Sequence, residues 1–182
     1  MEQQKRASNL FHDNLRTVKD WPKEGIEFLD ILKTVAFQPE VNAAVIDCFM
    51  DYYKDADIDA VAGVEARGFI FGAQLSYALH LPLVPIRKSG KCPPPISTVE
   101  YELEYGTDTL ELESVLIEEG MKVLLIDDLI ATGGTANAAI KLLKNAGAEV
   151  PYAAFIVELR ELDWKSQIQE GTEVFCVTDF PK

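Results

Sequence analysis

The sequence predicts an α/β protein built on a central parallel sheet flanked by helices, and three observations carry this prediction. Short apolar runs typical of buried strands alternate with segments of helical spacing along most of the chain. One such run, Val123 to Ile126, is followed at once by two carboxylates and a glycine-containing turn, as at the ligand-binding edge of open α/β sheets. A chain of 182 residues, 48% of them hydrophobic, can fill one substantial core, and no interdomain linker interrupts it.

The first half of the chain is predicted to supply a helix and then a strand–helix–strand unit. Pro39 stands at a helix start, and the apolar residues that follow it through Tyr52 recur every three to four positions, which indicates one buried helical face. Beyond this helix, residues 59–64 form a predicted strand, 69–79 a helix and 83–86 a second strand. Strands that alternate with helices in this way imply parallel pairing.

The middle of the chain is predicted to form an irregular segment and an antiparallel hairpin. Residues 89–97 are too rich in Pro and Gly for regular structure. Apolar and polar residues then alternate up to a turn at Gly106 and Thr107, and they alternate again beyond it. Glutamates fill polar positions of this hairpin, so periodicity alone indicates solvated side chains. These residues are Glu102, Glu104, Glu111 and Glu113.

The second half is predicted to continue the alternation of strands and helices. The apolar strand at 123–126 leads through a turn into 136–144, a run of good helix formers stopped by an Asn and a Gly. Residues 152–159 form another predicted buried strand. A short helix over 164–169 and a strand over 174–177 complete the expected fold.

Charge is distributed unevenly along the chain. The net charge of −13 argues against nucleic acid or an anionic membrane as general partners. Positive charge is nevertheless concentrated between positions 61 and 97, where Glu65 is the only acid. The Arg and Lys residues of this region are Arg67, Arg87, Lys88 and Lys91. An acidic protein that handles a polyanionic substrate must concentrate positive charge locally, so this region is the predicted anion site.

The sequence carries no sign of a membrane span or a secretory signal. No apolar run approaches the roughly 18 to 20 residues that cross a bilayer, and the polar N-terminus lacks the apolar region of a signal peptide. The cysteines, Cys48, Cys92 and Cys176, are odd in number and form no CxxC pair. We therefore expect a reduced, cytoplasmic protein.

The segment from Asp127 to Thr135 carries the clearest chemical signal. Its turn, Thr132 to Thr135, is small and hydroxylated, so backbone N–H groups can reach an anion at the start of the next helix. A P-loop is excluded because no Lys precedes the hydroxyl residue, and a dinucleotide fingerprint because the acids come before the glycines. Two carboxylates, Asp127 and Asp128, beside a phosphate cradle suit a phosphorylated ribose.

This segment resembles the phosphoribosyl pyrophosphate signature of the type I phosphoribosyltransferase family. Two further stretches, 63–72 and 103–106, are similar to the branch of the family that acts on adenine, and the likeness runs from about Trp21 to Phe180. The resemblance implies the type I phosphoribosyltransferase fold in a single domain, residues 1–182. It also implies a small N-terminal hood over about 1–35 and a flexible β-hairpin lid over about 88–106.

The resemblance further implies a purine-salvage reaction, in which adenine and phosphoribosyl pyrophosphate give AMP and pyrophosphate. Asp127 and Asp128 would hold the ribose 2′- and 3′-hydroxyls. Backbone N–H groups of the turn would bind the 5′-phosphate, with help from the threonine hydroxyls. The turn residues are Ala131, Thr132, Gly133, Gly134 and Thr135. Family members use Mg²⁺, which is held mainly by substrate and water, so no protein metal-ligand cluster is expected.

Further roles in the anion site and in catalysis are implied by the resemblance. Arg67 would grip pyrophosphate beside a non-proline cis bond between Glu65 and Ala66. Arg87, Lys88 and Lys91 would complete the anion site, with Lys91 arriving on a moving loop. Glu104 would accept or steer the proton that adenine loses, although periodicity alone does not distinguish it from the other hairpin glutamates. Tyr105 would pack against the pyrophosphate region when the lid closes.

The base is expected beneath the hood, at Gly25 to Asp30. Main-chain groups near Glu27 would read the base edge, while Phe28 and Leu159 would contact its face. The chain departs from its relatives at Leu29, where they commonly carry Arg. This departure leaves room for a phosphoribosyltransferase of 6-oxopurines such as hypoxanthine, guanine or xanthine.

A symmetric homodimer is expected because family members are usually dimers. A non-catalytic regulator that binds phosphoribosyl pyrophosphate is a further alternative. Such regulators add a DNA-binding domain, for which this acidic chain has neither spare length nor a basic patch.

Overall fold

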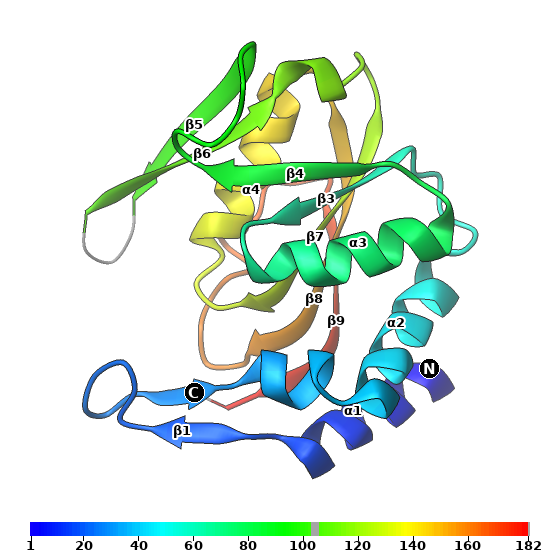
Figure 1. The fold of residues 1–182 in the computed structure, drawn as a ribbon, viewed down its shortest axis with the longest axis vertical. Helices are drawn as coiled ribbons and strands as arrows, with labels where there is room; N and C mark the ends of the chain where they lie inside the picture. The colour runs from blue at the N-terminus through cyan, green and yellow to red at the C-terminus, as the bar shows by residue number, and fades with distance from the viewer. Residues whose placement is uncertain (103–105, 182) are drawn as a thin grey trace.

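The central element of the structure, a computed structural model that describes residues 1–102 and 106–181, is a seven-stranded sheet (Figure 1). Its strand order is β5-β6-β4-β3-β7-β8-β9. The strands are β3 (Ala60–Val64), β4 (Leu83–Lys88), β5 (Ile96–Glu102), β6 (Thr107–Glu113), β7 (Lys122–Ile130), β8 (Glu149–Leu159) and β9 (Glu173–Phe180). The helices are α1 (Glu2–Asn14), α2 (Pro39–Tyr53), α3 (Arg67–Leu79) and α4 (Gly134–Asn145), with a π-helical turn at Leu32–Ala36 and a 3₁₀ turn at Ser114–Leu116.

The pairing within the sheet confirms the predicted topology. β3 pairs in parallel with β4 and β7, and β7, β8 and β9 continue the parallel part of the sheet. β5 and β6 form the predicted antiparallel hairpin. β6 joins the rest of the sheet through β4, where Arg87 lies opposite Glu111 and Lys88 opposite Leu110.

Helices cover both faces of the sheet (Figure 1). On one face α1, α2 and α3 bury a core that includes Phe71 from α3 and Leu124 and Ile126 from β7. On the other face α4 closes a second core, to which β7 contributes Val123 and Leu125. Because β7 is buried on both faces, its unbroken apolar run is the pattern expected of a central parallel strand.

The N-terminal hood lies beneath the ends of β7 and β8 (Figure 1). It contains β1 (Thr17–Lys19) and β2 (Glu27–Leu29), which pair antiparallel as a separate two-stranded sheet. The hood therefore covers the edge of the main sheet at which parallel strands present their carboxyl ends, where open α/β sheets bind ligands.

The structure corrects three details of the predicted elements. β5 begins at Ile96, within the segment 89–97 that was predicted to be irregular, because Ile96 and Ser97 already pair with β6. β7 does not end at Ile126 but continues to Ile130, because β8 keeps pairing with it after β3 has ended. Residues 164–169 form turns instead of the predicted short helix. This segment packs on the turn that precedes α4, so tertiary contact sets its conformation. Among the described residues, no helix is both long and apolar enough to cross a membrane.

Candidate active site

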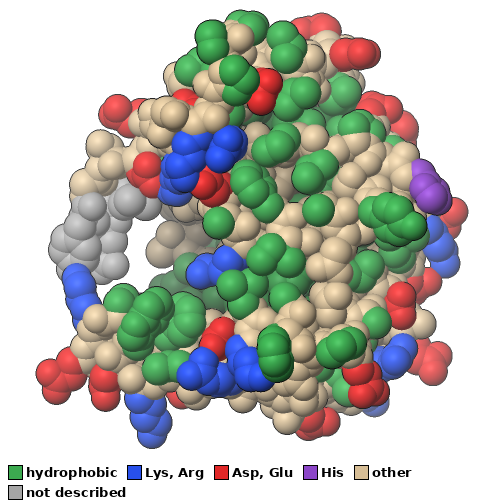
Figure 2. All heavy atoms as spheres, viewed as in Figure 1, with side chains coloured by type: hydrophobic (Ala, Val, Ile, Leu, Met, Phe, Trp, Pro, Cys, Tyr) green, Lys and Arg blue, Asp and Glu red, His purple; other side chains and the backbone are tan. Residues whose placement is uncertain are grey.

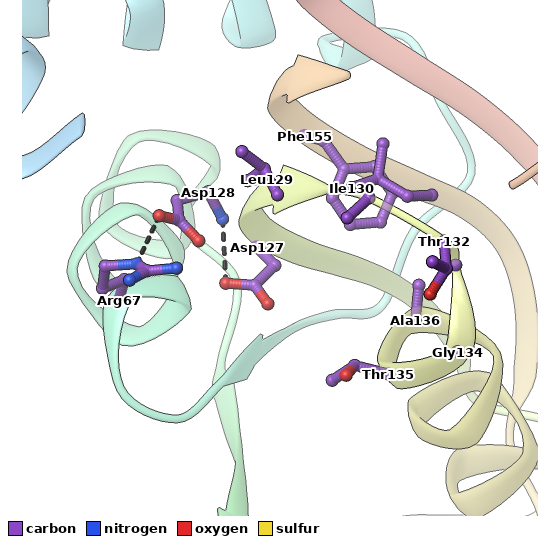
Figure 3. A pocket seen from close by; sticks show the side chains of 12 residues that line it. Arg67, Asp127, Asp128, Leu129, Ile130, Thr132, Gly134, Thr135, Ala136 and Phe155 are labelled. Carbon is purple, nitrogen blue, oxygen red and sulfur yellow. Dashed lines mark hydrogen bonds and ion pairs between the residues drawn. The ribbon is translucent and has the colours of Figure 1, made fainter. Parts of the chain in front are cut away.

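The turn between β7 and α4 forms one wall of a pocket of about 200 Å³ (Figure 3). Gly133 adopts a φ of +86°, and a Cβ there would lie 3.1 Å from the carbonyl oxygen of Trp164, so both backbone and packing require glycine. Within the described chain, the amides of Thr132 to Thr135 donate no hydrogen bond to another residue. Free N–H groups at a helix start are donors for an anion.

The two carboxylates of β7 line the same pocket (Figure 3). Asp127 Oδ1 accepts the backbone N–H of Asp128 at 2.8 Å, and the Asp128 carboxylate forms an ion pair with Arg67. Burial, followed by the charge of Asp128, raises the pKa of the Asp127 carboxyl well above its usual range. The two acids therefore differ in their electrostatic surroundings. Asp128 has a cationic partner, whereas Asp127 forms no ion pair with any described residue.

The start of α3 packs directly against β7. A Cβ on Gly68 would lie 2.9 Å from the carbonyl oxygen of Ile126 and 3.0 Å from Asp127 Oδ1, so only glycine permits this approach. The preceding peptide bond between Glu65 and Ala66 is cis, as the resemblance implies. This local structure places Arg67, the first residue of α3, beside the two acids.

A second cluster of charges surrounds Glu65, directly after β3. Lys91 forms an ion pair with its carboxylate, and Arg87 Nε lies 3.8 Å from Glu65 Oε2. The same oxygen accepts the backbone N–H of Lys88 at 2.9 Å. The hydrogen bond from Lys91, helped by the Lys88 amide, lowers the pKa of the Glu65 carboxyl. The structure thus gathers Arg87 and Lys91 around the one acid of the predicted anion region.

The ammonium group of Lys88 points to a different place. It donates a hydrogen bond to the Tyr101 hydroxyl at 2.9 Å and forms an ion pair with Asp108, so it reaches the β5–β6 hairpin. Its pKa is raised: desolvation acts to lower it, but the hydrogen bonds to Asp108 and Tyr101 outweigh that effect. Of the four bases predicted to bind anions, Arg67 alone lines the phosphate-type pocket.

A cavity of about 510 Å³ lies between the hood and the ends of β7, β8 and β9. Figure 2 shows a hollow between the lower part of this face, where the hood lies, and the body of the protein. The three residues predicted to contact the base, Glu27, Phe28 and Leu159, all line the cavity. Arg67 and Leu129 line both this cavity and the phosphate-type pocket, so the two spaces adjoin.

The walls of the larger cavity are mainly apolar. Leu29 is 8% exposed and contributes to this apolar lining. Phe28 is supported by Trp21, whose ring meets it edge to face with 4.4 Å between centroids. Phe180 and Pro181 add a wall from the C-terminal end of the described chain. A flat, largely apolar molecule suits such walls.

Most predicted site residues therefore come together, in two adjoining spaces and one neighbouring cluster. The phosphate-type pocket contains Arg67, Asp127, Asp128, Ala131, Thr132, Gly133, Gly134 and Thr135. Glu104 and Tyr105 lie outside the described residues, so their predicted roles stay predictions.

Several residues at or near the site were missed from the sequence, among them Leu129, which lines both spaces. Phe180 carries no local signal because it joins the cavity only through the position of β9. Trp164 packs against Gly133 in the turn between β7 and α4, and it donates its indole N–H to Glu158 at 3.0 Å. Glu111 was interpreted as a solvated strand glutamate, but it is 2% exposed.

Comparison with known proteins agrees with this geometry. A family model described as phosphoribosyl transferase domain matches residues 29–177. The adenine phosphoribosyltransferase of Pseudoalteromonas translucida is 45% identical over 172 residues, which cover 94% of each chain. The crystal structure of the Rhodothermus marinus adenine phosphoribosyltransferase superposes with a TM-score of 0.90 at 39% identity, over 97% of this chain and 99% of that one.

A third relative was solved with bound molecules. The adenine phosphoribosyltransferase of Saccharomyces cerevisiae, complexed with adenine and an imino-altritol bisphosphate, has a TM-score of 0.88 at 34% identity, with coverage of 95% and 99%. The chain therefore belongs to the phosphoribosyltransferase family and, within it, to the adenine phosphoribosyltransferases.

Proposed function

We propose that this chain transfers the 5-phosphoribosyl group of phosphoribosyl pyrophosphate to adenine, giving AMP and pyrophosphate in purine salvage. The observation that carries the proposal is the junction of two different spaces at Arg67 and Leu129. One space offers free amides and carboxylates for a ribose phosphate, and the other offers apolar walls for a base. The anomeric carbon belongs at their junction. The yeast relative, solved with adenine, supports this assignment of the base.

The reaction separates charge, and the acids of β7 are placed to follow it. Breaking the anomeric C–O bond leaves positive charge on the ribose ring and negative charge on pyrophosphate. Asp127 and Asp128 bind the ribose hydroxyls, and their carboxylates stabilise the developing cation. The raised pKa of Asp127 in the free protein falls when a cation forms nearby, because opposite charge favours the ionised carboxyl.

The phosphates are bound by amides at one end and by cations at the other. The turn from Ala131 to Thr135 holds the 5′-phosphate at the N-terminus of α4. Arg67, Arg87 and Lys91 bind the pyrophosphate, whereas the ammonium group of Lys88, the fourth base predicted for this role, reaches the β5–β6 hairpin. In the structure each of these cations has a carboxylate partner.

Glu104 is assigned the role of accepting the proton that the imidazole ring of adenine loses. A carboxylate near N7 or N9 accepts or steers this proton as N9 attacks, a contribution of about 10²- to 10⁴-fold in rate. Tyr105 packs against the pyrophosphate region. Both assignments rest on the resemblance of the stretch 103–106 to the family.

The base is read by the main chain of the hood. A carbonyl and an N–H near Glu27 pair with the amino group and N1 of adenine, while Phe28 and Leu159 contact its faces. Hypoxanthine reverses the donor and acceptor at these positions. A site whose buried donor and acceptor pair with adenine leaves both groups without a hydrogen-bond partner when hypoxanthine binds, so hypoxanthine is rejected.

Mg²⁺ fits the donor set of the site as a substrate-bound cation. Among residues 1–102 and 106–181, no group of three or more His, Cys, Asp and Glu side chains gathers to hold a metal. Asp127 and Asp128 still provide carboxylate oxygens, which suits Mg²⁺ that keeps water and phosphate ligands. When bound with the substrate, the ion neutralises charge on the leaving pyrophosphate.

A homodimer in the cytoplasm completes the proposal. The aromatic side chains of Phe37 and Tyr77 are 70% and 82% exposed, and a second protomer that covered either of them would remove apolar surface from water. All three cysteines are free thiols, as expected of a reducing compartment. Sedimentation velocity at micromolar concentration measures the oligomeric state directly.

The test of the proposed function is a Mg²⁺-dependent assay of pyrophosphate release with adenine, hypoxanthine, guanine and xanthine at fixed phosphoribosyl pyrophosphate. We expect adenine to exceed the other bases in kcat/KM by about 10⁴-fold or more. Hypoxanthine turning over within about tenfold of adenine would instead identify a 6-oxopurine enzyme. Binding of phosphoribosyl pyrophosphate without turnover of any base would identify a non-catalytic regulator.

A further inference from the structure

Glu111 is a buried carboxylate on β6 that the proposed chemistry does not use. Its neighbours Leu110 and Leu112 point into the core beneath α4, so Glu111 lies on the opposite face of the strand. An exposed glutamate is the usual occupant of such a position, yet Glu111 is 2% exposed. A carboxylate this well covered needs hydrogen-bond donors, and the structure supplies them from one short segment.

The donors are backbone amides of residues 89–95, the irregular segment between β4 and β5 that carries Lys91, called the Lys91 segment. Glu111 Oε1 accepts the N–H of Lys91 at 2.6 Å and the N–H of Cys92 at 2.7 Å. Together with the amide of Gly90, these bonds lower the pKa of the Glu111 carboxyl. One carboxylate thus accepts hydrogen bonds from consecutive backbone amides. The segment has no strand or helix of its own in which these amides could be paired.

The same segment is held from its other side by residues of the anion cluster. Arg87 Nη1 donates to the Lys91 carbonyl oxygen at 2.8 Å, and the Lys91 ammonium group forms an ion pair with Glu65. Arg87 also lies directly opposite Glu111 in the β4–β6 ladder. The backbone of Lys91 is therefore fastened at its N–H by Glu111 and at its carbonyl by Arg87.

We propose that Glu111 is a positioning residue for pyrophosphate binding, which acts by clipping the Lys91 segment in place beside Glu65. This proposal rests on the proposed function, since it assigns Lys91 to the pyrophosphate. Glu111 does not touch the substrate. In contrast to the moving loop that the resemblance implies for Lys91, Glu111 removes conformational freedom from the segment before the substrate arrives, so less ordering is left for binding.

The consequence is specific to one substrate. Loss of the clip leaves Lys91 distributed over more conformations, which weakens binding of phosphoribosyl pyrophosphate and of pyrophosphate. The larger cavity, proposed to hold the base and called the base cavity, is lined by the hood, by Arg67 and by the ends of β7 to β9. Neither Glu111 nor the Lys91 segment lines it. Binding of adenine should therefore be preserved.

The test compares Glu111→Gln with Glu113→Gln. Glu113 lies two residues along the same strand, loses the same charge when replaced, and is partly buried without a hydrogen bond to the Lys91 segment in the described structure. We expect Glu111→Gln to raise KM for phosphoribosyl pyrophosphate about tenfold or more, as for loss of hydrogen bonds to a charged acceptor. KM for adenine should stay within about twofold, and Glu113→Gln should match the wild type. Equal changes in both KM values would overturn the proposal.

A double-mutant cycle with Lys91→Ala separates positioning from a general structural effect. If Glu111 acts through Lys91, adding Glu111→Gln to Lys91→Ala should change KM for phosphoribosyl pyrophosphate by less than about threefold. Effects that multiply in full would show that Glu111 acts independently of Lys91, and the proposal would be wrong.

Amide hydrogen exchange tests the clip without any assay of activity. In the wild-type protein free of substrate, the amides of Lys91 and Cys92 should be protected, and Glu111→Gln should expose them while Glu113→Gln does not. Unprotected amides in the wild type would overturn the proposal even if no Glu111 variant folds. An enzyme that fails to convert adenine but shows this protection and its loss would refute the proposed function and leave the clip established.

Discussion

Arg67 and Asp128 form an ion pair that joins the first residue of α3 to the last part of β7 (Figure 3). The Asp128 side chain is 3% exposed, whereas the Arg67 side chain is 46% exposed and lines both the phosphate-type pocket and the base cavity. The buried acid therefore holds a cation at the junction of the two spaces. This pairing couples the stability of the site to its capacity to bind anions.

Replacing Arg67 by Ala should lower both stability and activity. Asp128 would be left buried without its partner, at a cost of about 1–3 kcal/mol in the free energy of unfolding, and pyrophosphate would lose a ligand. Urea denaturation and kcat/KM for phosphoribosyl pyrophosphate measure the two effects. Lys54→Ala is a matched control because the Lys54–Asp51 ion pair is exposed on both sides and should change neither quantity measurably. Unchanged stability in Arg67→Ala would show that the pair contributes nothing to the fold.

Asp127→Asn should stabilise the free protein while it lowers turnover. The pKa of Asp127 is raised above 3.8, so the folded protein keeps this proton at pH values where the unfolded chain has released it. The contribution of Asp127 to stability therefore decreases as pH rises from about 3.8 through the raised folded value. Asparagine removes this penalty and keeps the oxygen that accepts the Asp128 amide. We expect a gain of about 0.5–2 kcal/mol at neutral pH, and a smaller difference in acid.

The measurement for Asp127 is thermal unfolding of the wild type and the variant across that pH range. A variant that is less stable than the wild type at neutral pH would show that the carboxylate is not penalised in the folded state. Turnover near the wild-type level would separately remove Asp127 from the ribose-binding assignment.

Glu104→Gln should lower kcat by about 10²- to 10⁴-fold with little change in the affinity for either substrate. The carboxylate matters when the proton moves, not when the substrates bind. Single-turnover kinetics together with equilibrium binding of phosphoribosyl pyrophosphate separate the two effects. Glu102→Gln, a neighbouring glutamate of the same hairpin, is the control and should retain activity. A Glu104→Gln defect confined to binding would return this residue to the role of an ordinary strand glutamate.

Leu29→Ala should weaken adenine binding without changing the choice of base. Leu29 lines the apolar cavity, so its truncation removes contact with the base and should raise KM for adenine about tenfold. The main chain near Glu27 still reads the donor and acceptor pattern. The ratio of kcat/KM for adenine to that for hypoxanthine should therefore change by less than about threefold. A large change in that ratio would mean that the side chain at position 29 selects the base.

Local sequence was sufficient for the elements whose burial follows from their own residues. The apolar run at 123–126 predicted a central parallel strand, and alternation on both sides of Gly106 predicted the hairpin. The turn from Thr132 to Thr135 predicted backbone amides at the start of a helix, and the structure places this turn at the N-terminus of α4. In each case the signal lies within a few residues, because strand pleat, helix spacing and turn conformation are local properties.

Tertiary structure alone decided which charged residues meet. Periodicity predicted a solvated Glu111, but the Lys91 segment folds over it and supplies its hydrogen-bond donors. Arg67 and Asp128 are distant in sequence, and they pair because α3 packs on β7 through Gly68. The base cavity likewise needs the hood and Phe180, from opposite ends of the chain, to close on the strand ends. Burial and ion pairing depend on neighbours brought from elsewhere in the fold, and no local pattern encodes those neighbours.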